Sequence, residues 1–237
     1  MQYSRRFFVT ALGAAPFASI GQPISACATP SLGALSQRMG KAWLCMANPE
    51  LASAARDVLA ASQVTFEQQL VQLSRSPAGP EHAGSLRALA RRYEDYQGLL
   101  AGTPGEGQRA LLSTANEMLT LSQLANTARA TQPWQVRLAA RQRLLSQRVA
   151  LLGLASPGVE SVRRERQTAI YEFEAGLQTL RSAGAPALQQ RLAMADAAWA
   201  PLMDGIARGR PATVFDASER LLAVMDALTE HCARTNA

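Results

Sequence analysis

The same five-residue pattern occurs twice in this chain, first as Leu35-Ser36-Gln37-Arg38-Met39 and then, 110 residues later, as Leu145-Ser146-Gln147-Arg148-Val149. Three further matches follow in the same order along the chain. They pair Phe66-Glu67-Gln68-Gln69-Leu70 with Phe173-Glu174-Ala175-Gly176-Leu177, Tyr93 with Trp199, and Asn116-Glu117-Met118-Leu119 with Ser218-Glu219-Arg220-Leu221. The spacing between partners shrinks steadily, as it does when loops differ in length and helices do not. We therefore interpret the sequence as a tandem duplication.

Each half is predicted to form four helices. Asn48-Pro49 and Ser156-Pro157 each place a capping side chain before a proline, which is typical of a helix start. The predicted helices cover residues 31–47, 50–75, 81–101 and 108–131 in the first half, and 134–155, 158–183, 186–207 and 212–234 in the second. Short connections favour antiparallel neighbours, so the expected fold is all-α, with two tandem antiparallel four-helix bundles in residues 29–132 and 133–237.

The composition agrees with a helical protein and gives no sign of nucleic-acid binding. Of the 237 residues, 48% are hydrophobic and only 5% are aromatic, and valine and isoleucine are few, which favours helices over strands. The net charge is +6, but the basic residues are scattered among acidic ones and no basic block with interleaved aromatics occurs. Lys41 is the only lysine.

The first residues resemble a twin-arginine export signal. Ser4-Arg5-Arg6-Phe7-Phe8 gives the serine, the arginine pair and the phenylalanine of such signals, and a mildly apolar run follows in residues 9–20. This run is too short to cross a bilayer permanently. We predict a signal peptide in residues 1–28 and a mature protein in the periplasm.

Two ways of processing this signal remain open. Ala26-Cys27-Ala28 contains an A-x-A site for ordinary cleavage. Ile24-Ser25-Ala26-Cys27 also resembles a lipobox, in which Cys27 becomes the lipidated first residue of the mature protein. In the second case the only link to a membrane is the lipid on Cys27.

The second copy of the repeated pattern lies in a longer run, Ala140-Arg141-Gln142-Arg143-Leu144-Leu145-Ser146-Gln147-Arg148. This run resembles the signature of the PilJ/NarX family, the sensing domains of type IV pilus-associated chemotaxis transducers and of nitrate/nitrite sensor kinases. The resemblance implies a periplasmic four-helix bundle that dimerises. In the nitrate-binding members the anion lies between the signature helices of two subunits, which contribute one arginine each. The chain would thus contain both halves of such a dimer.

The resemblance also assigns residues to a binding site. The anion-binding arginine of the family corresponds to Arg143, and the second signature arginine corresponds to Arg148 in one half and to Arg38 in the other. The first half departs from the family pattern, because Gly33 stands where the second half has Arg143. The implied arginine pair is therefore incomplete.

Helical geometry adds a hypothesis about where this site lies. Arg143 and Gln147 share one face of their helix, and Gly33 and Gln37 share the equivalent face in the first half. We expect the two signature helices to meet at the junction of the bundles, with Arg143 in a small polar pocket beside Gln37 and Gln147. The planar guanidinium suits a small planar oxyanion such as nitrate or nitrite.

A purely structural interpretation stands beside this hypothesis. For Arg38 and Arg148 we favour ion pairs, and Asp57 and Glu165 on the following helices are the expected partners. For Arg143, which has no duplicate, a structural role and a ligand-binding role are weighed equally. The paired aromatic residues of the two halves are expected to be core residues because they recur at packing positions.

Motifs of enzymes and metal sites are absent from the sequence. The two histidines are isolated, and no spacing of histidine or cysteine fits zinc, thioredoxin-like or haem chemistry. No phosphate-binding loop or nucleophile elbow occurs. We therefore expect no enzymatic activity, no metal and no cofactor.

Three functions follow as hypotheses. The first is a periplasmic sensor-like module that binds a small anion, with nitrate or nitrite as candidates, and that acts through a partner such as a membrane sensor kinase or chemoreceptor. The alternative is a ligand-free helical interaction or scaffold module of the cell envelope. A third is a cofactor chaperone or enzyme accessory, which is suggested only by export through a route that carries folded proteins.

Overall fold

The computed structural model describes residues 31–75, 80–104, 107–125, 132–155, 160–183 and 186–235. The predicted export signal and Cys27 lie outside these residues. Eight helices occupy the described part of the chain, and no strand occurs there. They are α1 (Leu32–Cys45), α2 (Ala52–Arg75), α3 (Pro80–Leu100), α4 (Gln108–Leu124), α5 (Trp134–Leu154), α6 (Glu160–Ser182), α7 (Pro186–Ala207) and α8 (Pro211–Thr235). The all-α prediction is confirmed.

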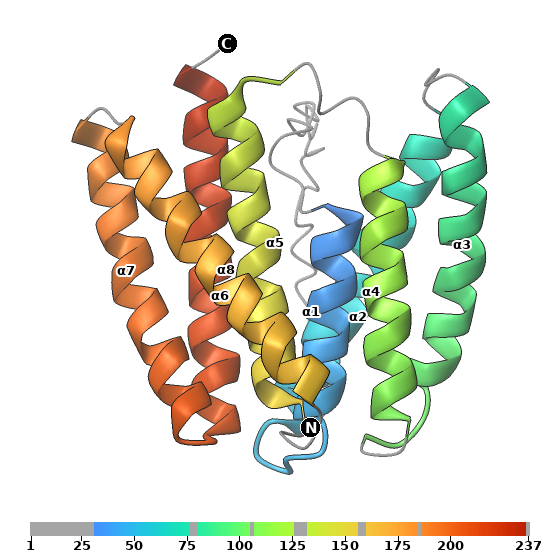
Figure 1. The fold of residues 1–237 in the computed structure, drawn as a ribbon. Coiled ribbons are helices and arrows are strands. Elements are labelled where there is room, and N and C mark those ends of the chain that lie inside the picture. The colour runs from blue at the N-terminus through green and yellow to red at the C-terminus, as the bar shows by residue number, and fades with distance from the viewer. Residues whose placement is uncertain are drawn as a thin grey trace, which may run out of the picture.

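The helices pack as two bundles side by side (Figure 1). One bundle consists of α1–α4 and the other of α5–α8, and each has its own apolar core. The two signature helices, α1 and α5, lie next to each other in the middle of the molecule and form most of the contact between the bundles. The expectation that they meet at the junction is confirmed. None of the described helices is both long enough and apolar enough to span a bilayer.

The helix ends follow the local signals of the sequence, with two differences. The fourth helix, predicted to extend to residue 131, ends at Leu124 with Ala125 as its C-cap. Ser31 caps α1, because its hydroxyl oxygen accepts a hydrogen bond from the backbone N–H of Ala34 (3.2 Å). Gly209 takes a left-handed conformation (φ 61°) in the short turn from α7 to α8. The second helix, predicted from residue 50, begins at Ala52 because Asn48 accepts a hydrogen bond from the N–H of Glu50 and holds a turn there.

Equivalent side chains make equivalent contacts in the two bundles. Phe66 stacks on Tyr93 with ring centroids 4.3 Å apart, and Phe173 stacks on Trp199 at 4.2 Å. Tyr93 donates a hydrogen bond to Glu67 (3.0 Å). Trp199 donates one to Glu174 (3.3 Å), which is the counterpart of Glu67. The duplication itself stays a prediction, and these matching contacts support it.

The last of the four sequence matches is displaced by one residue in the structure. The amide of Gln37 donates to the carbonyl oxygen of Ala115 (3.1 Å), and the amide of Gln147 donates to that of Ser218 (3.0 Å). Ala115 is therefore the counterpart of Ser218, whereas the sequence pairs Asn116 with Ser218. The shared Glu–X–Leu pattern predicts a pairing that is wrong by one residue, because helix packing decides which backbone carbonyl faces the glutamine.

Gln142 of α5 is an exception to this matching. Its side chain is fully buried, and neither amide atom has a hydrogen-bond partner in the described part of the chain. It fits only because it faces Gly176 of α6, where an added Cβ would lie 2.0 Å from the amide nitrogen. Its counterpart in the first half is the buried Leu32. A buried amide without partners costs stability.

We predict that Gln142→Leu stabilises the protein by about 1–2 kcal/mol, because it removes an unsatisfied buried amide. Urea unfolding followed by circular dichroism measures the change. Gln37→Leu is the matched control and should destabilise by about 1–3 kcal/mol, since Gln37 has bonded partners. A loss of stability in Gln142→Leu similar to that in Gln37→Leu would contradict this assignment.

Candidate functional site

The signature residues form a buried polar layer where α1 meets α5. Gln37 and Gln147 are completely buried, as are Ser36 and Ser146 beside them. Each serine hydroxyl donates to the carbonyl oxygen three residues earlier in its own helix, at 2.8 Å. Each glutamine amide donates to a backbone carbonyl of the last helix of its own bundle. The sequence repeat thus encodes a repeated set of interactions.

The two signature arginines reach across the junction into the other bundle. Arg38 of α1 donates from Nε (3.1 Å) and Nη2 (2.5 Å) to the carboxylate of Glu219 on α8. Arg148 of α5 donates to the amide oxygen of Asn116 on α4 (2.7 Å) and to Glu165 on α6 (2.8 Å). The arginines therefore connect the two bundles from opposite sides of the α1–α5 contact.

These contacts test the expected ion pairs. Glu165 is the partner of Arg148, so that prediction is confirmed. The prediction of Asp57 for Arg38 is wrong, because Arg38 points to α8 and pairs with Glu219 while Asp57 is exposed. The direction of a side chain across a bundle junction depends on how the helices cross, which the spacing along one chain does not reveal.

Lys41, the only lysine in the chain, also belongs to this network. The sequence patterns did not identify it as a site residue. It is completely buried, and its ammonium group lies 2.8 Å from Gln147 Oε1, 2.8 Å from Ser218 Oγ and 2.5 Å from Glu219 Oε1. The ring of Phe215 lies 5.3 Å from the same nitrogen. A sole lysine within the apolar spacing of α1, at the position of Leu151 in α5, was the available signal.

The charges of this network are strongly coupled. Burial lowers the pKa of Lys41, although the neighbouring Glu219 carboxylate opposes that shift. Burial acts to raise the pKa of Glu219, but Lys41 and Arg38 outweigh it and lower this pKa to about 2. Glu219 is thus an ionised carboxylate whose two oxygens both accept hydrogen bonds from cationic side chains.

Arg143 lies in the same region but pairs with a different acid. Its side chain is 1% exposed, and its Nε atom lies 2.5 Å from Oδ1 of Asp226 on α8. Burial raises the pKa of Asp226, and Arg143 acts against that rise. Asp226 follows Glu219 by seven residues, on the same face of α8. The anion-binding role of Arg143, with Gln37 and Gln147 beside it, stays a prediction, and the structure places the guanidinium against a carboxylate of the chain itself.

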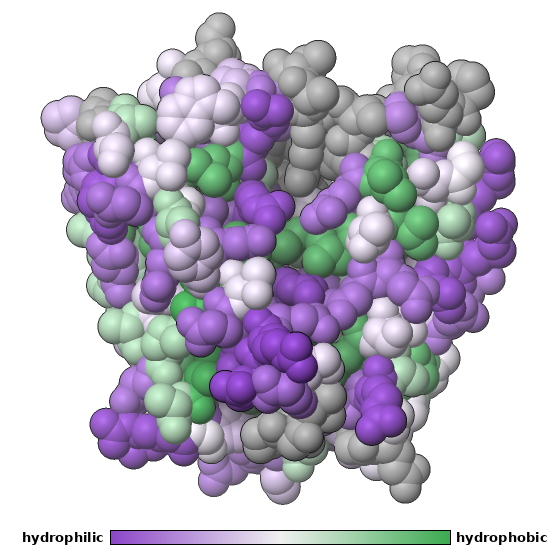
Figure 2. All heavy atoms as spheres, viewed as in Figure 1, coloured by the Kyte–Doolittle hydropathy of each residue, from purple (hydrophilic) through white to green (hydrophobic). Residues whose placement is uncertain are grey.

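The surface of the junction carries a groove that we call the α5 groove. Two adjoining hollows of 460 and 340 Å³ make it up, and both are lined by Gln123 of α4 and by Arg141 and Leu144 of α5. Its remaining wall consists of Ser31, the N-cap of α1, and of residues from the end of α4, from α5 and from α6, which include Leu119, Trp134, Arg137, Leu138, Arg148, Arg164, Glu165, Thr168 and Glu172. Figure 2 shows apolar surface bordered by polar side chains on the face where α4 and α6 flank the junction.

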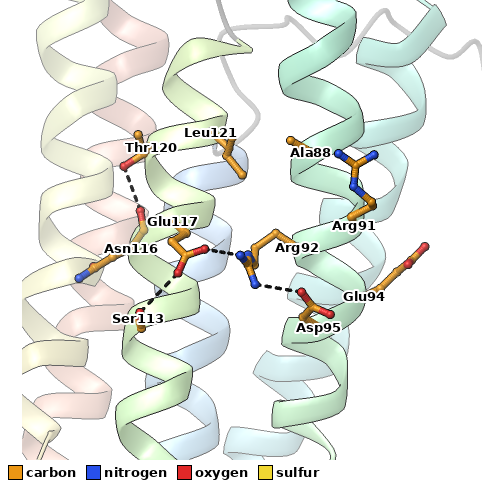
Figure 3. A pocket seen from close by; sticks show the side chains of 10 residues that line it. All are labelled: Ala88, Arg91, Arg92, Glu94, Asp95, Ser113, Asn116, Glu117, Thr120 and Leu121. Atoms are coloured by element: carbon orange, nitrogen blue, oxygen red, sulfur yellow. Dashed lines mark hydrogen bonds and ion pairs between the residues drawn. The ribbon is translucent and has the colours of Figure 1, made fainter.

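A second crevice lies between α3 and α4 (Figure 3). Arg92 bridges its two walls, with Asp95 3.0 Å away on α3 and Glu117 2.6 Å away on α4. Ser113 completes this group with a contact to Glu117 at 3.4 Å. Because charges of both signs neutralise each other here, this crevice has no clear preference for a charged ligand. In the described ranges no group of three or more histidine, cysteine, aspartate or glutamate side chains is arranged to hold a metal ion.

Comparisons with known proteins give no match for this chain. No protein-family model matches it, and neither a curated protein nor a solved structure is significantly similar. The resemblance to the PilJ/NarX family therefore depends on the signature residues alone.

We predict that the ion pairs of Glu219 make stability depend on pH. Its pKa in the folded protein, about 2, lies below the ordinary value of 4.5, so the stabilisation is complete above pH 4.5 and is lost as the pH falls towards 2. The difference in unfolding free energy between wild type and Glu219→Gln should shrink over that interval by on the order of 2 kcal/mol.

Urea unfolding at a series of pH values measures this difference. Asp226 titrates in both proteins, but Glu219 contributes the smallest part of its raised pKa, so most of this opposing titration cancels in the comparison. Glu230→Gln, which removes an exposed pair with Arg234 on the same helix, is the control and should show little change. A difference between wild type and Glu219→Gln that stays constant down to pH 2 would refute the assignment.

Proposed function

We propose that this chain is a non-enzymatic helical interaction module of the cell envelope, in which the signature residues hold two bundles together so that they present one fixed surface to a partner. The observation that carries this proposal is the internal pairing of all five predicted ligand-binding side chains. Each contacts a group of the chain itself. Arg38 donates to Glu219, Arg148 to Asn116 and Glu165, Gln37 to Ala115 and Gln147 to Ser218, while Arg143 lies in ion-pair contact with Asp226.

The energetics support a structural role for these residues. Removing one partner of a buried ion pair costs about 3–5 kcal/mol, because the remaining charge is left without compensation. Lys41 and Arg38 of the first bundle pair directly with Glu219 of the second. Substitution of any of the three would therefore weaken the contact between the bundles. A docking surface that includes helices of both bundles requires that the bundles keep a fixed relative orientation.

A second candidate is an oxyanion receptor of the type that the family resemblance implies. One observation favours it: Arg38 and Lys41 hold the planar carboxylate of Glu219 with donors on both of its oxygens. Nitrate and nitrite are also small planar oxyanions, and a guanidinium fork suits them. On this hypothesis a dissolved anion takes the place of an internal carboxylate, and a sensor kinase or chemoreceptor responds to the change.

A thermal-shift panel separates the two candidates. For the interaction module we expect the melting temperature to be the same in nitrate, nitrite, formate and acetate as in chloride of equal ionic strength. A true ligand at 100 times its dissociation constant would add ~2.7 kcal/mol of stability. A rise specific to nitrate or nitrite that disappears in Arg143→Ala would overturn the interaction module in favour of the receptor. An equal rise in wild type and Arg143→Ala would remove Arg143 from the site.

The location in the envelope is tested separately. We expect the double variant Arg5→Lys and Arg6→Lys to stay in the cytoplasm, because twin-arginine signals depend on the arginine pair. Cell fractionation with an epitope tag measures this. Cys27→Ser distinguishes the two processing routes, since it abolishes labelling by a radioactive fatty acid only if Cys27 is lipidated. Export of the double-lysine variant at the wild-type level would contradict the proposed route.

A further inference from the structure

We infer that the α5 groove is a docking site for an acidic amphipathic helix of a partner protein. This inference builds on the proposed interaction module and names the surface and the chemistry of the partner. The groove follows α5 from Trp134, its first residue, to Arg148. Fourteen residue steps of helix correspond to about 21 Å, which is the length of a docked helix of about four turns and is too long for a small molecule.

The charges of the groove favour an acidic partner. Four arginines line it, namely Arg137, Arg141, Arg148 and Arg164, against two glutamates. Both glutamates already pair with groove arginines, Glu165 with Arg148 at 2.8 Å and Glu172 with Arg141 at 2.6 Å. Arg164 also pairs with Glu160 of α6 at 3.3 Å, but this pair is exposed and Glu160 is shared with Arg163. Arg137 and the shared pairing of Glu160 therefore leave the groove and its edge with more positive than negative charge. A positive rim attracts acidic side chains and fixes the orientation of the partner.

The floor of the groove supplies the apolar contact that a helix needs. Leu119 of α4 and Leu138 of α5 are partly buried and lie beside the core of the second bundle. Leu144 is 7% exposed. Trp134 stands at one end with 41% of its surface exposed. An apolar stripe inside a rim with an excess of one charge is the pattern by which grooves recognise amphipathic helices.

Helix α8 is an internal example of a helix that packs against a signature arginine. On the other side of the α1–α5 contact, α8 presents Glu219 to Arg38 and, one turn earlier, Phe215 to an apolar cluster with Cys45 and Leu51. A helix that carries an apolar residue and a glutamate four positions apart thus already satisfies one signature arginine. On the groove side the counterparts of Phe215 and Glu219 on α4 are Leu112 and Asn116. They are smaller, and neither of them is acidic.

The test uses a defined peptide. A fluorescein-labelled peptide of fifteen residues, with leucine at positions i, i+3, i+4 and i+7, glutamates on the opposite face and alanine elsewhere to favour a helix, is titrated with the purified protein while anisotropy is followed. We expect saturable binding that weakens as salt is added. Arg137→Glu and Arg164→Glu, which reverse exposed rim charges, should each weaken binding at least tenfold. The same peptide with lysine in place of glutamate should not bind.

Arg91→Glu is the matched control, because it reverses an arginine of the α3–α4 crevice and should leave the affinity unchanged. Circular dichroism of each variant confirms that the fold is retained. No saturable binding of the acidic peptide, or equal affinity in the two rim variants and wild type, overturns the docking site. The thermal-shift panel tests the interaction module independently of the peptide. If no oxyanion raises the melting temperature and the peptide does not bind, the docking site is refuted but the proposed interaction module is not.

Discussion

The contact between α1 and α5 places charged and amide side chains where two apolar cores meet. The relative position of the helices depends on giving each of these side chains a hydrogen-bond or ion-pair partner. Gln37, Gln147 and Lys41 have no exposed surface, so each must find a partner within the protein. The partners lie on α4 and α8, the last helices of the two bundles. The glutamines hold the last helix of each bundle against its signature helix, whereas the contacts of Lys41 cross the junction and restrict the relative placement of the bundles, because hydrogen bonds depend on distance and direction. The polar layer thus specifies the orientation of the bundles, while the apolar cores supply stability.

The two halves have similar contacts but have become different at the junction. The first half contributes Lys41 where the second has Leu151, and the second half contributes Arg143 where the first has Gly33. Both differences place a positive charge close to α8, where Lys41 pairs with Glu219 and Arg143 pairs with Asp226. The helix equivalent to α8 in the first half, α4, offers only neutral groups at the corresponding positions. One side of the junction is therefore closed by internal ion pairs, and the other side carries the basic groove.

Much of the fold could be predicted from the sequence, because its signals are local. Prolines, glycines and capping side chains indicate where helices begin and end, and the aromatic pairs Phe66/Tyr93 and Phe173/Trp199 recur at packing positions. The partners of Arg38 and Lys41 could not be predicted in the same way. Glu219 lies 181 residues from Arg38, and only the crossing of the bundles brings them together. The single lysine in an apolar stripe was visible in the sequence, but nothing local indicates which carboxylate compensates it.

The internal carboxylates also limit where recognition can occur. A carboxylate tethered beside an arginine competes with dissolved anions at an effective concentration that is millimolar or higher for a short tether. Glu219 is held in addition by Lys41, which loses its compensation if the carboxylate leaves. A weakly binding oxyanion cannot offset that cost through one or two hydrogen bonds. A partner that spreads its contacts along the α5 groove, as proposed, would leave these ion pairs intact and need no such exchange.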